Sequence, residues 1–256
     1  MNLDLKDKVF VVSGGAKGIG AGIVKVLASE GAIPVIIGRN QADNESMLHE
    51  ISGNGFFVTA ELNNPDECRW AVEAVMHQYG RIDGLVNNAG VNDGVGLESG
   101  NYETFMSSLH KNLVHYYLMA HFALPALIKS KGVIVNIGSK VAETGQGNTS
   151  AYAAANGGRN ALTREWAVEL LKYGIRVNAV IVAESYTPLY EKWIQSLPNP
   201  GEKLKSITDK IPLGKRMTTP EEIANMVAFL LSERSSHTTG QLIHVDGGYT
   251  HLDRAL

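Results

Sequence analysis

The sequence has very little cysteine and no excess of basic residues. Cys68 is the single cysteine in 256 residues, so no internal disulfide can form. The eight histidines show no metal-ligand spacing with Cys68 or with one another, which predicts that the protein holds no metal. The formal net charge of −3 argues against a nucleic-acid partner.

Long apolar runs are also missing. No stretch approaches the roughly 18 consecutive apolar residues that cross a bilayer. Residues 1–9 carry acids where a secretory signal would carry bases and an apolar run. We therefore expect a cytoplasmic protein with no membrane partner. Apolar residues make up 44% of the chain and charged residues 19%, which is ordinary globular usage and predicts a full core.

Short apolar runs alternate with longer helical patterns along the whole chain. Seven runs lack the polar alternation of a one-sided sheet and are predicted to be strands: Lys8–Ser13, Ile33–Ile37, Gly55–Thr59, Ile82–Asn87, Val133–Ile137, Arg176–Val180 and Leu242–Val245. The helical patterns are Gly18–Glu30, Asp43–Ser52, Pro65–Tyr79, Tyr102–Lys129, Ser150–Tyr173 and Pro220–Ser232. Right-handed crossovers stack such units as a three-layer α/β/α sandwich. We therefore expect an α/β fold, one Rossmann domain over residues 1–256 with a mostly parallel seven-stranded sheet.

The stretch 184–217 breaks this alternation. It has no predicted strand and carries four prolines, Pro188, Pro198, Pro200 and Pro212. A long insertion of this kind inside a compact domain is more often a substrate lid than a linker, so we predict a lid over residues 184–217.

A glycine-rich turn follows the first predicted strand. It reads Ser13-Gly14-Gly15-Ala16-Lys17-Gly18-Ile19-Gly20 and runs straight into a helical pattern. Its glycines allow a tight turn and a close approach to a pyrophosphate, whose charge meets the free amide groups of a helix N-terminus. The alternative is an ordinary turn before a helix. The position after the first strand predicts a dinucleotide site formed by Gly14, Lys17, Gly18, Ile19 and Gly20.

The end of the second predicted strand bears on the choice between NAD and NADP. A protein that prefers NAD usually places an acid there for the ribose 2′-hydroxyl, and this chain has Arg39. A guanidinium suits a 2′-phosphate, and Lys17 adds a second positive charge nearby. The alternative is that both are solvated surface cations. We predict NADP as the cofactor, with NAD as the alternative.

Five further segments follow in a defined order. They are Asn87-Asn88-Ala89-Gly90 after the fourth predicted strand, Asn112 in the next helix, Ser139 after the fifth strand, Tyr152 at the start of the following helix, and Val245-Asp246-Gly247-Gly248 at the end of the sheet. Together with the glycine turn, they make the chain resemble the short-chain dehydrogenase/reductase family over essentially its whole length. The resemblance implies an NAD(P)-dependent oxidoreductase that moves a hydride between nicotinamide and an alcohol or sugar carbon.

The resemblance also implies roles for single residues. Tyr152 would be the base that takes the proton of the alcohol, since a base must lie within hydrogen-bond reach of the oxygen when the hydride leaves. Ser139 would hold the substrate oxygen, and Asn112 would anchor a water chain through its main chain and side chain. The cofactor contacts further along the chain would be Asn88, Ala89, Gly90, Val182 and Thr187.

One position departs from the family pattern. Family members carry lysine four residues after the tyrosine, on the same helix face, and this chain has Asn156 there. A nearby ammonium favours the phenolate of a tyrosine, whose unperturbed pKa is about 10. If the lysine lowers that pKa by about 3 units, its loss corresponds to roughly 4 kcal/mol of phenolate stabilisation. Asn156 cannot supply the charge, although it can still hydrogen-bond the nicotinamide ribose.

Three interpretations of Asn156 remain open from the sequence. The protein is a slow or high-pH enzyme, a protein that binds its cofactor without turnover, or a lysine-to-asparagine variant engineered to trap a complex.

Within the family, the chain is most similar to bacterial sugar dehydrogenases of the L-fucose dehydrogenase kind. The similarity rests on residues 144–150, 162–166, 183–184, 187–190 and 247–254. Polar residues expected around the mouth of the site suit a polyol, because polar side chains discriminate by pairing with hydroxyl groups; they are Asn92, Glu143, Gln146 and Glu184. The alternative is that all four are exposed loop residues. We expect an aldose such as L-fucose to be oxidised at its anomeric carbon to the lactone, with another small alcohol or ketone as the alternative substrate.

The predicted helix Tyr102–Lys129 carries more apolar side chains than one sheet face needs: Phe105, Leu109, Leu113, Tyr116, Tyr117 and Phe122. Family members are usually tetramers joined through two long helices and the C-terminal strand, so the resemblance implies a homotetramer. The alternative is a core helix buried within one subunit.

Overall fold

Seven short apolar strands run side by side through the centre of the molecule in the computed structural model, which describes residues 2–253. They are β1 (Val9–Ser13), β2 (Ile33–Gly38), β3 (Phe56–Thr59), β4 (Gly84–Asn87), β5 (Val133–Ser139), β6 (Arg176–Val182) and β7 (Leu242–Val245). The sheet order is β3-β2-β1-β4-β5-β6-β7, and every pairing between named strands is parallel. The order changes direction between β1 and β4, and ligands bind at such a switch point, beyond the carboxyl ends of the strands.

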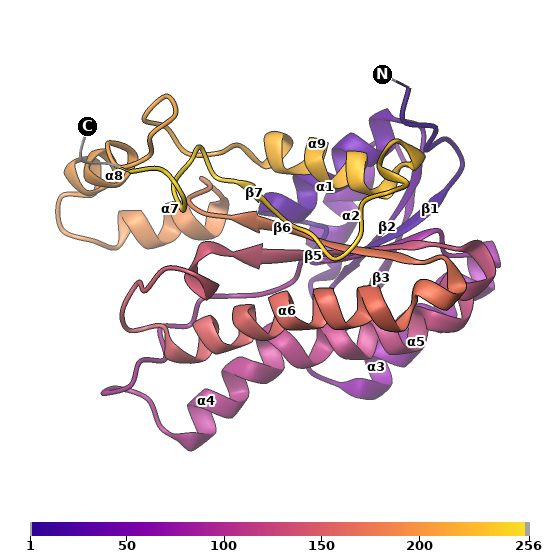
Figure 1. Ribbon diagram of the computed structural model, residues 1–256, viewed down its shortest axis with the longest axis horizontal. Helices are drawn as coiled ribbons and strands as arrows, with labels where there is room; N and C mark the ends of the chain where they lie inside the picture. The colour runs from indigo at the N-terminus through magenta and orange to yellow at the C-terminus, as the bar shows by residue number, and fades with distance from the viewer. Residues whose placement is uncertain (1, 254–256) are drawn as a thin grey trace.

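Helices cover both faces of this sheet, which confirms the three-layer sandwich (Figure 1). One face is covered by α3 (Pro65–Tyr79), α5 (His115–Ser130) and α6 (Ser150–Glu169), and the other by α1 (Gly18–Ser29), α2 (Gln41–Glu50) and α9 (Pro220–Leu231). Successive side chains of a strand point to opposite faces. In β1, Val9 and Val11 pack into one core and Phe10 and Val12 into the other. Both faces are buried, as the continuous apolar runs predict.

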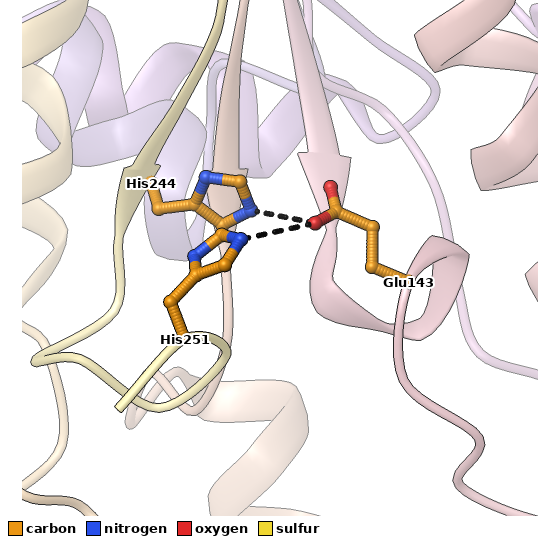
Figure 2. A group of neighbouring side chains, drawn as sticks. All are labelled: Glu143, His244 and His251. Carbon is orange, nitrogen blue, oxygen red and sulfur yellow. Dashed lines mark hydrogen bonds and ion pairs between the residues drawn. The ribbon is translucent and has the colours of Figure 1, made fainter. Parts of the chain in front are cut away.

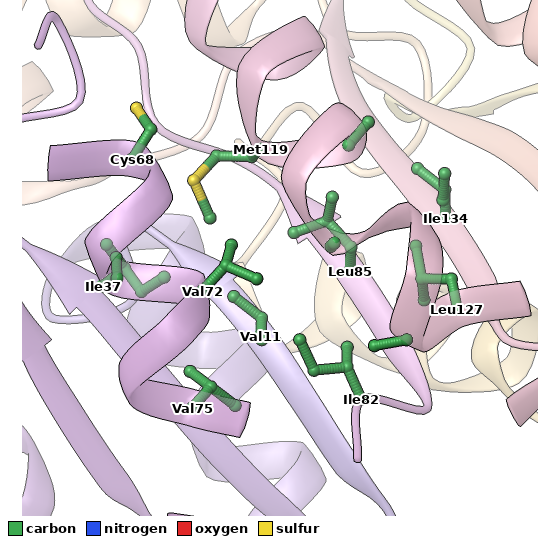
Figure 3. Packing of buried hydrophobic residues seen from close by; sticks show 14 of the residues in the cluster. Val11, Ile37, Cys68, Val72, Val75, Ile82, Leu85, Met119, Leu127 and Ile134 are labelled. Carbon is green, nitrogen blue, oxygen red and sulfur yellow. The ribbon is translucent and has the colours of Figure 1, made fainter. Parts of the chain in front are cut away.

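The core under α3 and α5 contains the single cysteine. Figure 3 shows Cys68 and Val72 of α3 facing Met119 of α5 over the strands. The Sγ of Cys68 donates to the carbonyl of Leu62 at 3.3 Å. Burial, helped by the charges of Glu67 and Glu61, raises the pKa of the Cys68 thiol to about 11. The thiol is therefore unreactive.

The prediction of one unbroken helix over Tyr102–Lys129 is wrong in one respect. The segment consists of α4 (Tyr102–Leu109), a π-helical turn (His110–Val114) and then α5. The backbone stays helical at both junctions, with φ of −61° at Leu109 and −67° at His115, so the change is a wider turn within a continuing helix. Such π-helical turns often mark functional sites. This one carries Asn112, which is fully buried.

The segment 184–217 contains two helices, α7 (Pro188–Gln195) and α8 (Pro200–Thr208), each of which starts on a proline that suits the first helical turn. Figure 1 shows both beyond the carboxyl ends of β5 and β6. An isolated parallel bridge between Ser185 and Thr218 joins the two ends of the segment. Its closure over a substrate stays a prediction.

Short 3-10 turns complete the chain at Lys140–Ala142, Leu171–Tyr173 and Glu233–Ser235. Over residues 2–253, no helix has both the length and the apolar character needed to span a bilayer.

Candidate active site

The glycine turn joins β1 to α1 at the carboxyl edge of the sheet. Gly14 and Gly18 have left-handed backbone with φ of 65° and 56°, which glycine adopts without strain. A Cβ on Gly20 would lie 2.1 Å from the carbonyl oxygen of Gly14, so no side chain fits there. In the described chain, Lys17 gives the first-turn amides of α1 no side-chain cap. These open amides fit the pyrophosphate of a dinucleotide.

The loop after β4 is held against this turn by Ser13. The buried Ser13 Oγ accepts hydrogen bonds from the backbone N–H of Asn88 at 2.9 Å and of Ala89 at 3.1 Å. The Asn88 Nδ2 donates to the carbonyls of Ser13 at 2.9 Å and Gly14 at 3.2 Å. Thr187, at the start of α7, lies beside the same turn. A Cβ built on Gly18 would be 3.2 Å from the Cγ2 of Thr187. Cofactor residues predicted from three separate segments therefore meet.

Arg39 stands at the carboxyl end of β2, and Lys17 lies in the glycine turn after β1. The Arg39 side chain is 79% exposed, and its Nη1 lies 3.8 Å from Glu61 Oε2. The Lys17 Nζ pairs with Asp43 Oδ2 at 2.7 Å. Arg39 therefore has only a long contact with an acid, whereas the charge of Lys17 is already paired.

Ser139 and Tyr152 come from adjoining elements. Ser139 is the last residue of β5 and does not follow the strand as predicted, since its backbone still pairs in register with Val182 of β6. Its buried Oγ accepts from the N–H of Val141 at 3.4 Å. Tyr152 is half-buried in the first turn of α6.

The π-helical turn aims Asn112 at the loop after β4. Its Oδ1 accepts from the N–H of Val91 at 2.7 Å, and its Nδ2 donates to the carbonyl of Ser108 at 3.0 Å. The Asn112 carbonyl accepts from Nε of Arg159 at 2.6 Å. The atoms from which a water chain was expected to start thus have protein partners in this structure.

Asn156 is fully buried, and its side chain turns back along α6. Its Nδ2 donates to the Tyr152 carbonyl at 2.8 Å, and its Oδ1 accepts from Arg159 Nη1 at 3.1 Å. Arg159 is only 3% exposed and also donates from Nη1 to the carbonyl of Ile137 at 3.1 Å. A buried guanidinium therefore lies one turn beyond Asn156 in α6.

A buried ion pair follows directly after Ser139. The ammonium of Lys140 contacts the Glu184 carboxylate, with side chains 7% and 14% exposed. The Lys140 Nζ lies 3.7 Å from the ring centroid of Tyr249. Burial, together with the charge of Glu184 and a hydrogen bond to it, holds the pKa of the Tyr190 hydroxyl above its usual value of 10. This group of polar side chains, from four separate segments, is named the Lys140 cluster below.

Figure 2 shows a second convergence, in which His244 of β7 and His251 both point at the carboxylate of Glu143. Their Nε2 atoms lie 3.1 Å and 3.7 Å from Glu143 Oε2, and the two rings meet edge to face at 4.4 Å. Two imidazoles and a carboxylate, within 4.8 Å of one another, are donors that Zn²⁺ accepts. They pair with one another already, and the expectation of no metal stays a prediction.

Two of the four residues predicted to contact the substrate do not join these groups. Asn92 and Gln146 are exposed, and Asn92 Oδ1 accepts from the N–H of Gly94 at 3.3 Å. Glu184 belongs to the Lys140 cluster, and Glu143 to the histidine group.

Comparison with known proteins agrees with this geometry. A family model of short-chain alcohol dehydrogenase type, described as enoyl-(acyl carrier protein) reductase, matches residues 14–250. The chain belongs to the short-chain dehydrogenase/reductase family. It is 35% identical to the L-fucose dehydrogenase of Bos taurus over 242 residues, which cover 94% of this chain and 88% of that protein. It is 36% identical to a 3-oxoacyl-[acyl-carrier-protein] reductase of Thermotoga maritima over 249 residues, covering 95% and 98% of the two chains.

Solved structures of short-chain dehydrogenases show the same fold. The Cj0485 dehydrogenase is 48% identical with a TM-score of 0.96, covering 100% of this chain and 99% of that one. The ligand-free aldohexose dehydrogenase of Thermoplasma acidophilum is 30% identical with a TM-score of 0.91, again covering 100% and 99%. The chain is therefore an oxidoreductase that uses a nicotinamide dinucleotide.

Four residues at or near the site were not singled out by the sequence analysis: Lys140, Arg159, His244 and His251. Arg159 lies seven residues after Tyr152 and three after Asn156, and this helical spacing was a signal that could have revealed it. Lys140 was equally visible beside Ser139. His244 and His251 gave no local signal, because only the fold brings them to Glu143.

Proposed function

We propose that the protein is a sugar dehydrogenase that oxidises an aldose such as L-fucose at its anomeric carbon to the lactone. The observation that carries this proposal is the Lys140 cluster, in which the buried ammonium directly after Ser139 pairs with the largely buried carboxylate of Glu184. Buried polar groups that pair with hydroxyl groups discriminate strongly against substrates that lack them. An acyl chain or a steroid has no run of hydroxyl groups to hydrogen-bond the Lys140–Glu184 pair, whereas a polyol does.

The residues divide the reaction between them. Ser139 would hold the anomeric oxygen, and the ionised Tyr152 would take the hydroxyl proton as the carbonyl of the lactone forms. When bound, the dinucleotide supplies the nicotinamide ring that accepts the hydride. The open amides of α1 and the loop at Asn88 would hold its pyrophosphate and ribose. Thr187 would lie toward the nicotinamide amide.

NADP is the proposed form of the cofactor. Arg39 stands at the end of β2, where the 2′-substituent of the adenosine ribose lies in such folds. Its guanidinium is exposed and has only a 3.8 Å contact with Glu61, so it is available to a 2′-phosphate.

The relatives support a sugar. Besides the L-fucose dehydrogenase and aldohexose dehydrogenase, an L-xylulose reductase of Bos taurus is 36% identical over 252 residues. A second candidate is reduction of a small ketone, favoured by the 3-oxoacyl-[acyl-carrier-protein] reductase of Thermotoga maritima. A third is cofactor binding without turnover, because Asn156 stands where the family resemblance leads us to expect lysine.

The test is to supply NADP or NAD with a panel of aldoses, and to follow reduced cofactor by absorbance from neutral to alkaline pH. We expect turnover with at least one aldose and product release as the lactone. The control Tyr152→Phe keeps the ring and should abolish turnover while preserving cofactor affinity. Reduction of a 3-ketoacyl thioester without any sugar oxidation would favour the second candidate, and tight cofactor binding without turnover the third.

A cytoplasmic homotetramer is the proposed assembly. Tyr117 on α5 is 51% exposed, and Val168 on α6 and Leu171 just after it are 69% and 59% exposed. Such apolar surface on the two long helices suits an interface between copies. Tyr116, also counted toward that surface from the sequence, is instead fully buried in the core, where its hydroxyl donates to the carbonyl of Ile137. Light scattering would give the mass of the particle.

A further inference from the structure

Arg159 is a buried cation whose described contacts are all neutral. Its guanidinium donates to the carbonyls of Asn112 and Ile137 and to the amide Oδ1 of Asn156. Its Nη2 is buried and has no hydrogen-bond partner in the part of the chain that the structure describes. Burying a cation without a negative partner is costly, so an anion that forms beside it is strongly favoured.

Two phenols lie near the guanidinium. Arg159 Cζ is 4.2 Å from the ring centroid of Tyr116 and 6.0 Å from that of Tyr152. The Tyr116 hydroxyl donates to the carbonyl of Ile137 at 3.0 Å, and its burial raises its pKa, so it stays neutral. Tyr152 is half-buried at the candidate site. Tyr152 is therefore the phenol that can become the partner anion.

The other titratable groups described around Tyr152 leave this role to Arg159. Burial, together with the charge of Arg159, lowers the pKa of His115 to about 3, so this imidazole is neutral at physiological pH. Lys140 belongs to the 3-10 turn that packs against α6, but its ammonium is paired with Glu184.

Asn156 and Arg159 form one unit with Tyr152. The three residues occupy positions i, i+4 and i+7 of α6 and so share a helix face. Asn156 bridges them, since its Nδ2 donates to the Tyr152 carbonyl and its Oδ1 accepts from Arg159 Nη1 at 3.1 Å. A lysine at 156 would bring an ammonium against this guanidinium, whereas the neutral amide accommodates it.

We propose that Arg159 supplies the positive charge that favours the ionised form of Tyr152, one helical turn beyond the residue where the family carries lysine. The inference rests on the proposed function, in which Tyr152 is the base. Arg159 acts on Tyr152 through its charge, so it is a positioning residue. On this basis Asn156 is a partner of Arg159, and the protein keeps a cationic active site.

The test compares wild type with Arg159→Met, Arg159→Lys, Asn156→Lys and the double variant Asn156→Lys/Arg159→Met. Two readouts are followed in the holoenzyme: the pH profile of kcat/KM, and the ultraviolet titration of tyrosinate with the Tyr152→Phe spectrum subtracted. Arg159→Met should move both midpoints upward by about one to two pH units, the effect of removing a unit charge at such a separation, and should lower the rate at neutral pH about 10- to 100-fold.

Arg159→Lys should keep both midpoints near those of wild type. The double variant Asn156→Lys/Arg159→Met should lower the raised midpoints of Arg159→Met to values near those of wild type. Asn156→Lys alone should gain little rate and should lose stability, because it adds a second buried cation. Unchanged midpoints in Arg159→Met, or a double variant that remains shifted, would overturn the inference. If Arg159→Met does not fold, the midpoints of Arg159→Lys and of the double variant test the inference. The spectroscopic titration needs no substrate, so it separates this failure from failure of the proposed sugar oxidation.

Discussion

Replacing Glu184 by Gln should destabilise the protein strongly, because it leaves the Lys140 ammonium buried without a counter-charge. The Lys140 side chain is 7% exposed, so water reaches it poorly. Breaking a buried ion pair by removing one partner costs about 3–5 kcal/mol in the free energy of unfolding. For a chain of this size that loss corresponds to a fall in Tm of roughly 6–20 °C.

The double variant Lys140→Met/Glu184→Gln should recover most of that stability, since it removes both charges and leaves an apolar side chain of similar length. The matched control is Asp209→Asn, which breaks the exposed Lys205–Asp209 pair on α8 and should not change Tm measurably. Thermal and urea unfolding, followed by circular dichroism, measure all four proteins. A Glu184→Gln protein within about 1 kcal/mol of wild type, or a double variant no more stable than Glu184→Gln, would refute the reasoning.

Other outcomes follow from the structure. Gly20→Ala should abolish measurable dinucleotide binding, because the added Cβ would lie 2.1 Å from the Gly14 carbonyl oxygen, whereas Gly201→Ala, with open space around it, should bind normally in the same titration. Arg39→Ser should raise the KM for NADP about 10- to 100-fold, the cost of a charge-assisted hydrogen bond, and leave that for NAD nearly unchanged; equal effects on both would contradict the NADP proposal. The pKa of His115 is lowered from 6.5 to about 3, so the unfolded chain takes up this proton first as pH falls, and stability should decline by up to about 4–5 kcal/mol between pH 6.5 and pH 3. Urea unfolding of His115→Gln over that range should show a shallower decline. Dialysis against a chelator should leave turnover unchanged; a loss restored by Zn²⁺ would instead assign a metal to Glu143 and its two histidines.

Local patterns were sufficient for most of the fold. The strand predicted over Val133–Ile137 is largely apolar on both sides, and the helix Pro65–Tyr79 has its proline and first-turn acids at one end, so residue type alone predicted these two elements. Their ends were less certain. Ser139 continues β5 because its neighbour on β6 offers a pairing partner, and that partner is not a local signal.

The glycine turn could also be predicted from local sequence. Gly14, Gly18 and Gly20 fit their positions because glycine has no side chain, and the sequence shows directly where glycine occurs. Only the tertiary structure shows which charged side chains pair when they are far apart in the sequence. Glu184 lies far from Lys140 in sequence, and the histidines lie far from Glu143, yet parallel strands end at one edge and bring them together. The burial of Arg159 beside Tyr152 was likewise decided there, because helix α6 alone does not say which face its neighbours cover.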